Sequence, residues 1–251
     1  MIQYLVPEIY YLLEGILAYE EGNHKVQLGP QDYLVTSDLE SKFILSALSD
    51  VEFLYVSSAP GFSEVSQRLN ELMQLAVDIE IKDGYTADHC YRIQQLSYRT
   101  GLELGLDSNS LFRLDNASYL HDIGKIKVPL EILQKPDKLS MDEWRIMQQH
   151  PIFGREFLEN TLIKDAAPIV EQHHERLDGS GYPYHLAGDD IMVEASIVAV
   201  ADSFDAMTTD RPYRARLSRE DAYAELKQGA GIVYEQEVVK AFLSAVKKIS
   251  H

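Results

Sequence analysis

The hydrophobic pattern of this chain changes its period near residue 63, and this change constrains the fold more than any other feature. Before it, short runs rich in aliphatic and aromatic residues are separated by turn-forming residues, at 15–19, 32–36, 43–47 and 52–57. After it, apolar residues follow the spacing of a helix that packs one face against a core: Val65, Leu69, Leu72, Met73, Ala76 and Ile79. We therefore expect a mainly α protein, in which a small β module over residues 1–62 precedes an all-helical domain over residues 64–251.

The helical part carries local signals for where its helices begin. Ser140–Glu143 is a capping-box pattern, Asp107 precedes a helix that leads toward His121, and Ser218 precedes an acidic first turn. Glycine and proline gather at 179–183, which predicts a loop there.

The charge balance limits the partners of the chain. A formal net charge of −17 argues against a protein that coats nucleic acid, because binding to the phosphate backbone depends on clusters of lysine and arginine. An acidic protein that handles a phosphate substrate has to offset repulsion locally, with metal ions or a few placed cations.

Other features indicate the compartment. Cys90 is the single cysteine, which excludes an intramolecular disulfide and fits a reducing environment. The N-terminus has no basic segment typical of a secretory signal, and no apolar run reaches the length of about 20 residues that spans a bilayer. We therefore expect a cytoplasmic protein.

Several histidines and carboxylates stand in settings that suggest metal binding. They are His89, His121, Asp122, His150, His173, His174 and Asp202. Imidazole and carboxylate without thiolate suit divalent iron, manganese or zinc, and a carboxylate such as Asp122 is able to bridge two ions. Lys125 falls one turn after His121 if the helix continues, where its charge would stabilise phosphate oxygens.

Taken singly, each of these residues has a plainer interpretation. A lone histidine such as His89 is more often a core or capping residue, and His173 and His174 suit the end of a helix. Asp202 and Lys125 are equally compatible with solvated positions. The ligands are far apart in the sequence, so spacing alone leaves a multi-histidine metal site as one possibility.

The segments together resemble a known family. Leu120–Ile126, with His121-Asp122 and Lys125, looks like the signature of HD phosphohydrolases, and His173–Pro183 looks like the HHExxDGxGYP segment of HD-GYP domains. The stretches 129–133, 135–139, 201–207 and 210–213, and His150 with Gly154, follow the family order. The resemblance covers roughly residues 64–245. Leu177 departs from it, where a tryptophan is usual, and so does 234–237, where Phe-Asp-Pro is common.

The resemblance implies a cyclic di-GMP phosphodiesterase that yields the linear dinucleotide or GMP, with a metal-bridging hydroxide as the nucleophile. It implies seven metal ligands, with Asp122 as the bridge: His89, His121, Asp122, His150, His173, His174 and Asp202. Lys125 would act near the scissile phosphate, and Arg211 and Arg214 would bind substrate phosphate. Family members with a third metal carry a glutamate where this chain has Tyr85, so we expect two ions, iron or manganese.

The resemblance also implies partners. The GYP loop, which includes Asp178, Gly179, Gly181, Tyr182 and Pro183, would shape the rim of the site or contact a diguanylate cyclase domain. The β module resembles a truncated cupin-like barrel, which would sense a signal or form a homodimer, or else cap the helical core.

Three functional classes remain open at this point. The complete ligand set favours an active phosphodiesterase, for which cyclic GMP-AMP is the alternative substrate to cyclic di-GMP. A catalytically weak sensor or interaction module would have lost a ligand, and none is missing. A phosphohydrolase acting on another nucleotide is disfavoured by the GYP segment and by the stretch from Arg211 to Arg214.

Overall fold

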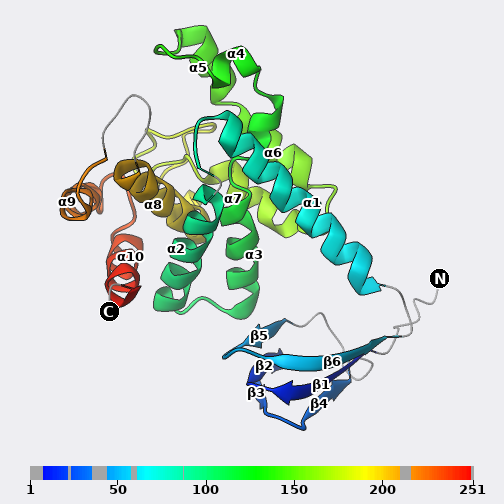
Figure 1. The fold of residues 1–251 in the computed structure, drawn as a ribbon. Helices are drawn as coiled ribbons and strands as arrows, with labels where there is room; N and C mark the ends of the chain where they lie inside the picture. Colours follow the sequence, from blue (N-terminus) through cyan, green and yellow to red (C-terminus); the bar gives the residue numbers. More distant parts are fainter. Residues whose placement is uncertain are drawn as a thin grey trace. The chain divides into compact units, whose positions relative to one another are not determined.

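The computed structural model describes residues 8–21, 24–35, 44–57, 61–86, 88–209 and 216–249. The chain divides into two compact units, Met1–Leu69 and Asn70–His251. In its described residues the first unit contains six strands and the start of helix α1, and the second is helical, which confirms the mainly α fold with a small β region before it (Figure 1). None of the described helices combines the length and the apolar character that crossing a bilayer requires.

The β region consists of two three-stranded antiparallel sheets, with the strand orders β4–β1–β6 and β3–β2–β5. The strands are β1 (Glu8–Glu14), β2 (Leu17–Glu21), β3 (His24–Leu28), β4 (Tyr33–Val35), β5 (Leu45–Ala47) and β6 (Glu52–Ser57). The sequence pattern singled out neither β1 nor β3. Each completes one of the two sheets, because β1 is the central strand of one sheet and β3 is an edge strand of the other.

An apolar cluster joins the two sheets. Strand alternation turns Leu12 and Leu34 of one sheet inward, where they pack with Leu17 and Leu28 of the other. Gly15, between β1 and β2, has a φ of +86°, and a side chain there would meet the backbone of Asp50. The small β unit thus closes around its own core.

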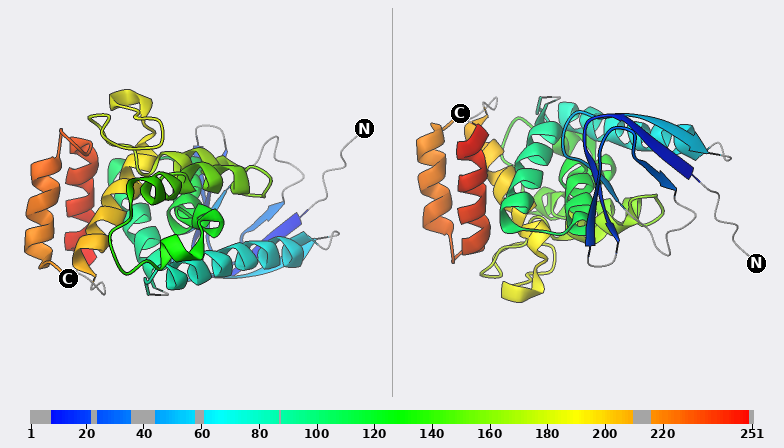
Figure 2. Two further views of the ribbon diagram at one scale, coloured as in Figure 1. Left: turned by 90° about the horizontal axis from the view of Figure 1, so that it is seen from above. Right: turned by 90° about the horizontal axis from the view of Figure 1, so that it is seen from below.

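The helical unit is built from α-helices and short 3₁₀ segments. These are α1 (Gly61–Lys82), α2 (His89–Leu104), α3 (Ser108–Tyr119), η2 (Ile123–Lys127), α4 (Leu130–Leu133), α5 (Met141–Met147), α6 (His150–Leu158), η3 (Lys164–Ala166), α7 (Ala167–Gln172), η4 (Gly188–Asp190), α8 (Val193–Thr208), α9 (Arg219–Gly229) and α10 (Gln236–Ile249). Figure 2 shows α9 and α10 side by side at one end of this unit.

The predicted helix starts are confirmed. The side chain of Asp107 accepts a hydrogen bond from the backbone N–H of Ser110, and Ser218 accepts one from Asp221. Ser140 and Glu143 form both hydrogen bonds of a capping box. The short polar side chain before each helix thus satisfies an amide that the helix leaves free.

Helix α8 is the centre of the helical core. Ala195 and the run 197–201 are buried around its circumference, as expected of a helix enclosed by others. It contacts α2, α3, α7, α9 and α10. Its polar exceptions, including Asp202 and Asp205, are therefore held on a rigid support.

The turn after α3 differs from the sequence expectation. Helix α3 ends at Tyr119, and a 3₁₀ segment, η2, begins at Ile123, so no continuous α-helix carries His121 and Lys125. Gly124 in this segment lies against α6: a Cβ there would stand 1.9 Å from the His150 carbonyl oxygen and 2.4 Å from the Gly154 nitrogen. The absence of a side chain at Gly124 lets the two segments meet.

Gly124→Ala tests this close approach. Because the added methyl group meets backbone atoms, which cannot rotate away, we expect a loss of about 2 kcal/mol or more in stability. Thermal unfolding followed by circular dichroism measures it. Gly29→Ala is the matched control, since the nearest atom to its Cβ is 3.8 Å away. Equal melting temperatures for Gly124→Ala and the unmodified chain would contradict this interpretation.

Candidate metal centre

The structure brings together all seven residues that the sequence singled out as metal ligands. His89 and His150 are the first residues of α2 and α6, and His173 and His174 directly follow α7. His121 and Asp122 occupy the turn between α3 and η2, and Asp202 lies on α8. Helix ends therefore supply six of these residues and the central helix supplies the seventh.

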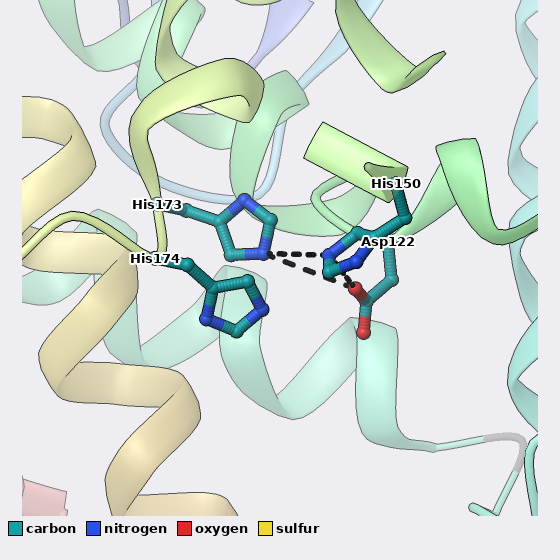
Figure 3. Close-up of side chains that lie close together, drawn as sticks. All are labelled: Asp122, His150, His173 and His174. Carbon is teal, nitrogen blue, oxygen red and sulfur yellow. Dashed lines mark hydrogen bonds and ion pairs between the residues drawn. The ribbon is translucent and has the colours of Figure 1, made fainter. Parts of the chain in front are cut away.

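Four of them form one group, shown in Figure 3. Asp122, His150, His173 and His174 each offer a ligand atom, and these atoms lie within 4.8 Å of one another. Oδ1 of Asp122 is 3.0 Å from Nε2 of His150 and 3.8 Å from Nε2 of His173, and these two nitrogens are 3.4 Å apart. The group has the size of a single metal-binding position.

The remaining three, His89, His121 and Asp202, form a second group with the same spacing of ligand atoms. Asp122 connects the groups, because its Oδ2 is 3.3 Å from Nε2 of His121 while its Oδ1 faces His150. This is the position that a bridging carboxylate requires.

Hydrogen bonds at the far side of the rings determine where the lone pairs point. Nδ1 lies 2.6 to 3.0 Å from the carbonyl oxygen of the residue three positions earlier in three of the histidines, His121, His150 and His173. A carbonyl oxygen only accepts hydrogen bonds, so Nδ1 carries the hydrogen in the neutral ring, and Nε2 presents its lone pair to the centre. Converging lone pairs fit a divalent cation between them.

Burial favours a neutral ring at His173 and His174. At His121 burial opposes the charge, but Asp122 raises the pKa to about 9, so a metal ion there would displace a proton. The pKa values of His173 and His174 are held well below the usual range by burial and by the neighbouring histidines, so both rings stay neutral near pH 7. Burial alone would raise the pKa of Asp122, but Lys125 and His121 outweigh it and hold that pKa well below the usual range. Neutral imidazole and ionised carboxylate are the forms that bind metal ions.

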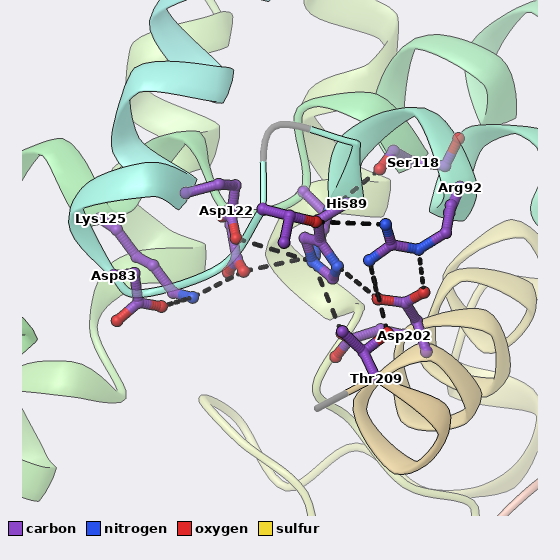
Figure 4. A network of polar contacts seen from close by, with 12 residues as sticks. Asp83, His89, Arg92, Ser118, Asp122, Lys125, Asp202 and Thr209 are labelled. Carbon is purple, nitrogen blue, oxygen red and sulfur yellow. Dashed lines mark hydrogen bonds and ion pairs between the residues drawn. The ribbon is translucent and has the colours of Figure 1, made fainter. Parts of the chain in front are cut away.

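Lys125 reaches the centre, although η2 rather than an α-helix carries it. Its Nζ donates to Asp83 at 2.6 Å and to Asp122 at 2.7 Å, and the side chain is buried (Figure 4). Burial opposes its charge, but Asp122, Glu80 and Asp83 raise its pKa well above the usual range. Lys125 is therefore a fixed cation beside the candidate bridge.

On its Nδ1 side, away from the metal groups, His89 belongs to a second network of hydrogen bonds that includes Arg92 (Figure 4). Nδ1 of His89 is 2.8 Å from Oδ2 of Asp205, and Arg92 bonds to both oxygens of that carboxylate at 2.5 and 2.9 Å. Burial would raise the pKa of Asp205, but Arg92 and His89 lower it to about 2. An ionised Asp205 requires a hydrogen on Nδ1 of His89, which leaves Nε2 free for the centre.

The GYP loop touches the centre through one residue. The ring of Tyr182 stacks on His174 with centroids 4.6 Å apart, and Trp144, which is half exposed, meets Tyr182 edge-on at 6.0 Å. Gly181 has no side chain to collide with the His174–Arg176 backbone. Asp178 forms an isolated antiparallel β-bridge with Ala187, and Gly179 has a φ of +75°. The backbone therefore turns at this end of the loop. Pro183 is half-buried.

Four residues near the centre were not predicted: Glu80, Asp83, Trp144 and Asp205. Burial raises the pKa of Glu80 to about 8. The spacing of Asp205 from Asp202 on one helix face was the available signal, whereas Glu80 and Asp83 gave none. The predicted phosphate contacts Arg211 and Arg214 lie outside the described residues.

Comparisons with known proteins agree with this geometry. A family model described as HD domain matches residues 57–238. The chain is 40% identical over 187 residues to the cyclic di-GMP phosphodiesterase response regulator RpfG of Xanthomonas campestris, covering 73% of this chain and 50% of that protein. It is 38% identical to a cyclic di-GMP phosphodiesterase of Thermotoga maritima, covering 82% and 57%.

A 3'3'-cGAMP-specific phosphodiesterase 2 of Vibrio cholerae is 38% identical over 183 residues, which are 72% of this chain and 35% of that protein. The chain thus spans about half the length, or less, of the curated relatives it matches.

Two solved structures have similar folds. Bd1817, a HDG"Y"P protein from Bdellovibrio bacteriovorus, has a TM-score of 0.51 at 22% identity, covering 63% of this chain and 51% of its own. The V. cholerae cyclic GMP-AMP specific phosphodiesterase V-cGAP3 has a TM-score of 0.56 at 17% identity, covering 71% and 48%. At these identities the likeness concerns the fold alone. With the family model matching most of its length, the chain belongs to the HD domain family, as the HD-GYP motifs of its sequence predicted.

Proposed function

We propose that this chain is a metal-dependent phosphodiesterase that hydrolyses a cyclic dinucleotide, with cyclic di-GMP as the substrate. The observation that carries the proposal is the convergence of imidazole Nε2 atoms on both oxygens of Asp122. The relatives named above act on cyclic di-GMP or 3'3'-cGAMP, which supports the substrate class and leaves 3'3'-cGAMP as the alternative.

The donor set suits two divalent ions, iron or manganese. One would be held by Asp122, His150, His173 and His174, and the other by His89, His121 and Asp202 with Asp122 between them. Bound ions of this kind lower the pKa of water and polarise a phosphodiester group. Histidine nitrogens and carboxylate oxygens without thiolate favour these metals over softer ones.

Lys125 is placed to assist the reaction directly. Its ammonium group has three N–H donors, and Asp83 and Asp122 accept two of them. Among the described residues no third acceptor is seen, so the remaining N–H would donate to a phosphate oxygen, whose negative charge grows as the phosphodiester bond breaks. Arg211 and Arg214 would bind substrate phosphate, and the GYP loop would line the rim or meet a diguanylate cyclase domain. The β unit would serve as a sensory or dimerising module.

The first experiment measures metal content and turnover together. Protein purified without oxygen and loaded with Fe(II) or Mn(II) is expected to bind about two ions per chain and to hydrolyse cyclic di-GMP. Parallel assays with 3'3'-cGAMP decide between the two substrates. Bound metal without hydrolysis of either would favour a sensor, and the absence of bound metal would refute the enzyme proposal.

Two substitutions separate binding from chemistry. Asp122→Ala is expected to remove metal and activity together, because the bridge is lost.

Lys125→Met is expected to keep the metal and to reduce kcat about 100-fold, because one cationic donor to the phosphate is lost. Full turnover by Lys125→Met would show that its charge has no catalytic role.

Asp205→Asn tests the support of His89. The amide no longer requires a hydrogen on Nδ1 of His89, so we expect metal affinity to fall about 10- to 100-fold while the fold is kept. Titration of metal-free protein with Mn(II) measures the change. Asp115→Asn is a control, since Asp115 accepts a hydrogen bond from Gln94 and takes no part in the metal groups. Equal affinities for the two variants would contradict the role of Asp205.

A further inference from the structure

Glu80 is a buried carboxylate that the proposed metal sites leave unused. It lies near the end of α1, and the side chain is 1% exposed. Neither of its oxygens has a hydrogen-bond partner among the described residues. Placing a carboxylate in such a position is costly unless a cation or a donor compensates it.

Nε2 of His89, which faces Glu80, cannot supply a hydrogen bond or a positive charge to its carboxylate. Oε2 of Glu80 is 3.7 Å from Nε2 of His89, which is beyond hydrogen-bonding distance. Because Nδ1 of His89 carries the hydrogen that is shared with Asp205, Nε2 presents a lone pair. A lone pair of nitrogen and the lone pairs of a carboxylate thus face each other across a gap that suits a cation.

The lysine whose charge acts on Glu80 donates its hydrogen bonds to other carboxylates. Lys125 contributes to the electrostatic field at Glu80, but among the described residues its hydrogen bonds go to Asp83 and Asp122. Ligand atoms of Glu80, His89 and Asp122 lie within 4.8 Å of one another, as in the other two metal groups. The geometry of Glu80 therefore matches that of a ligand.

We propose that Glu80 is a metal ligand whose carboxylate binds the same divalent ion as Nε2 of His89. This inference rests on the proposed metal centre. Nε2 has one lone pair and binds one ion, so Glu80 adds a ligand to the ion of His89, His121 and Asp202 rather than creating a third position. Although Tyr85 stands where family members with a third metal carry a glutamate, Glu80 of α1 places a carboxylate beside His89.

Glu80→Gln tests the proposal, because the amide keeps the size of the side chain and is a much weaker ligand. Equilibrium dialysis of metal-free protein with Mn(II) measures stoichiometry and affinity. The unmodified chain is expected to bind about two ions. Glu80→Gln is expected to bind the ion of the His150 group normally and the other at least about tenfold more weakly.

Thermal unfolding gives a second readout. Since Glu80 makes no hydrogen bond among the described residues, metal-free Glu80→Gln is expected to melt no lower than the metal-free unmodified chain. The rise in melting temperature on adding Mn(II) is expected to be smaller for the variant, because stabilisation by a ligand follows its affinity.

Glu194→Gln is the matched control. Glu194 is also a buried glutamate of the helical unit, but it pairs with Arg113 and takes no part in the metal groups. We expect this control to lower the melting temperature and to leave Mn(II) binding unchanged. If Glu80→Gln does not fold, Glu80→Asp decides, because it keeps the charge and withdraws the carboxylate by one methylene group.

Two outcomes would overturn the inference. Binding of both ions with unchanged affinity by Glu80→Gln, or by Glu80→Asp where that variant decides, would show that Glu80 is not a ligand while leaving the metal centre intact. Failure of the unmodified chain to bind Mn(II) would instead refute the proposed centre, and the role of Glu80 with it.

Discussion

The rest of the site depends on the contacts of one carboxylate, that of Asp122. One oxygen faces His150 and His173, and the other faces His121 and accepts a hydrogen bond from Lys125. These partners come from separate segments, so the carboxylate can meet them all only if the turn after α3 lies against α6. Gly124 permits that approach, and a requirement of local backbone geometry thereby becomes a requirement of the site.

Backbone carbonyl groups at the helix ends also determine which ring nitrogen of the histidines carries the hydrogen. In His121, His150 and His173, the carbonyl oxygen three residues earlier fixes the hydrogen on Nδ1, and this carbonyl belongs to the same turn of chain as the ring. The tautomer is therefore set locally, before any distant residue contributes. His89 is the exception: its Nδ1 faces Asp205 on α8, so its orientation depends on the packing of α2 against the central helix.

The sequence predicted features that depend on adjacent residues, such as helix caps, and missed features that depend on tertiary packing, such as the burial of Glu80. The caps at Asp107, Ser140 and Ser218 follow from a few adjacent residues, and the change of period separated strands from helices. The grouping of the seven candidate ligands came from motifs shared with a family, since nothing in their spacing required it. Glu80, next to Ile79 on an amphipathic helix, looks like a solvated position, and only the packing of the helical unit buries it.

The charges around the candidate centre favour the binding of metal ions. Among the described residues around the centre, five carboxylates lie close together (Glu80, Asp83, Asp122, Asp202 and Asp205), and Arg92 and Lys125 donate hydrogen bonds to three of them. Fully ionised, this set repels a phosphodiester anion, as does a chain with a net charge of −17. The two divalent ions of the proposed function would reverse the local sign, so the ions that hold the carboxylates together would also make the site attractive to an anionic substrate.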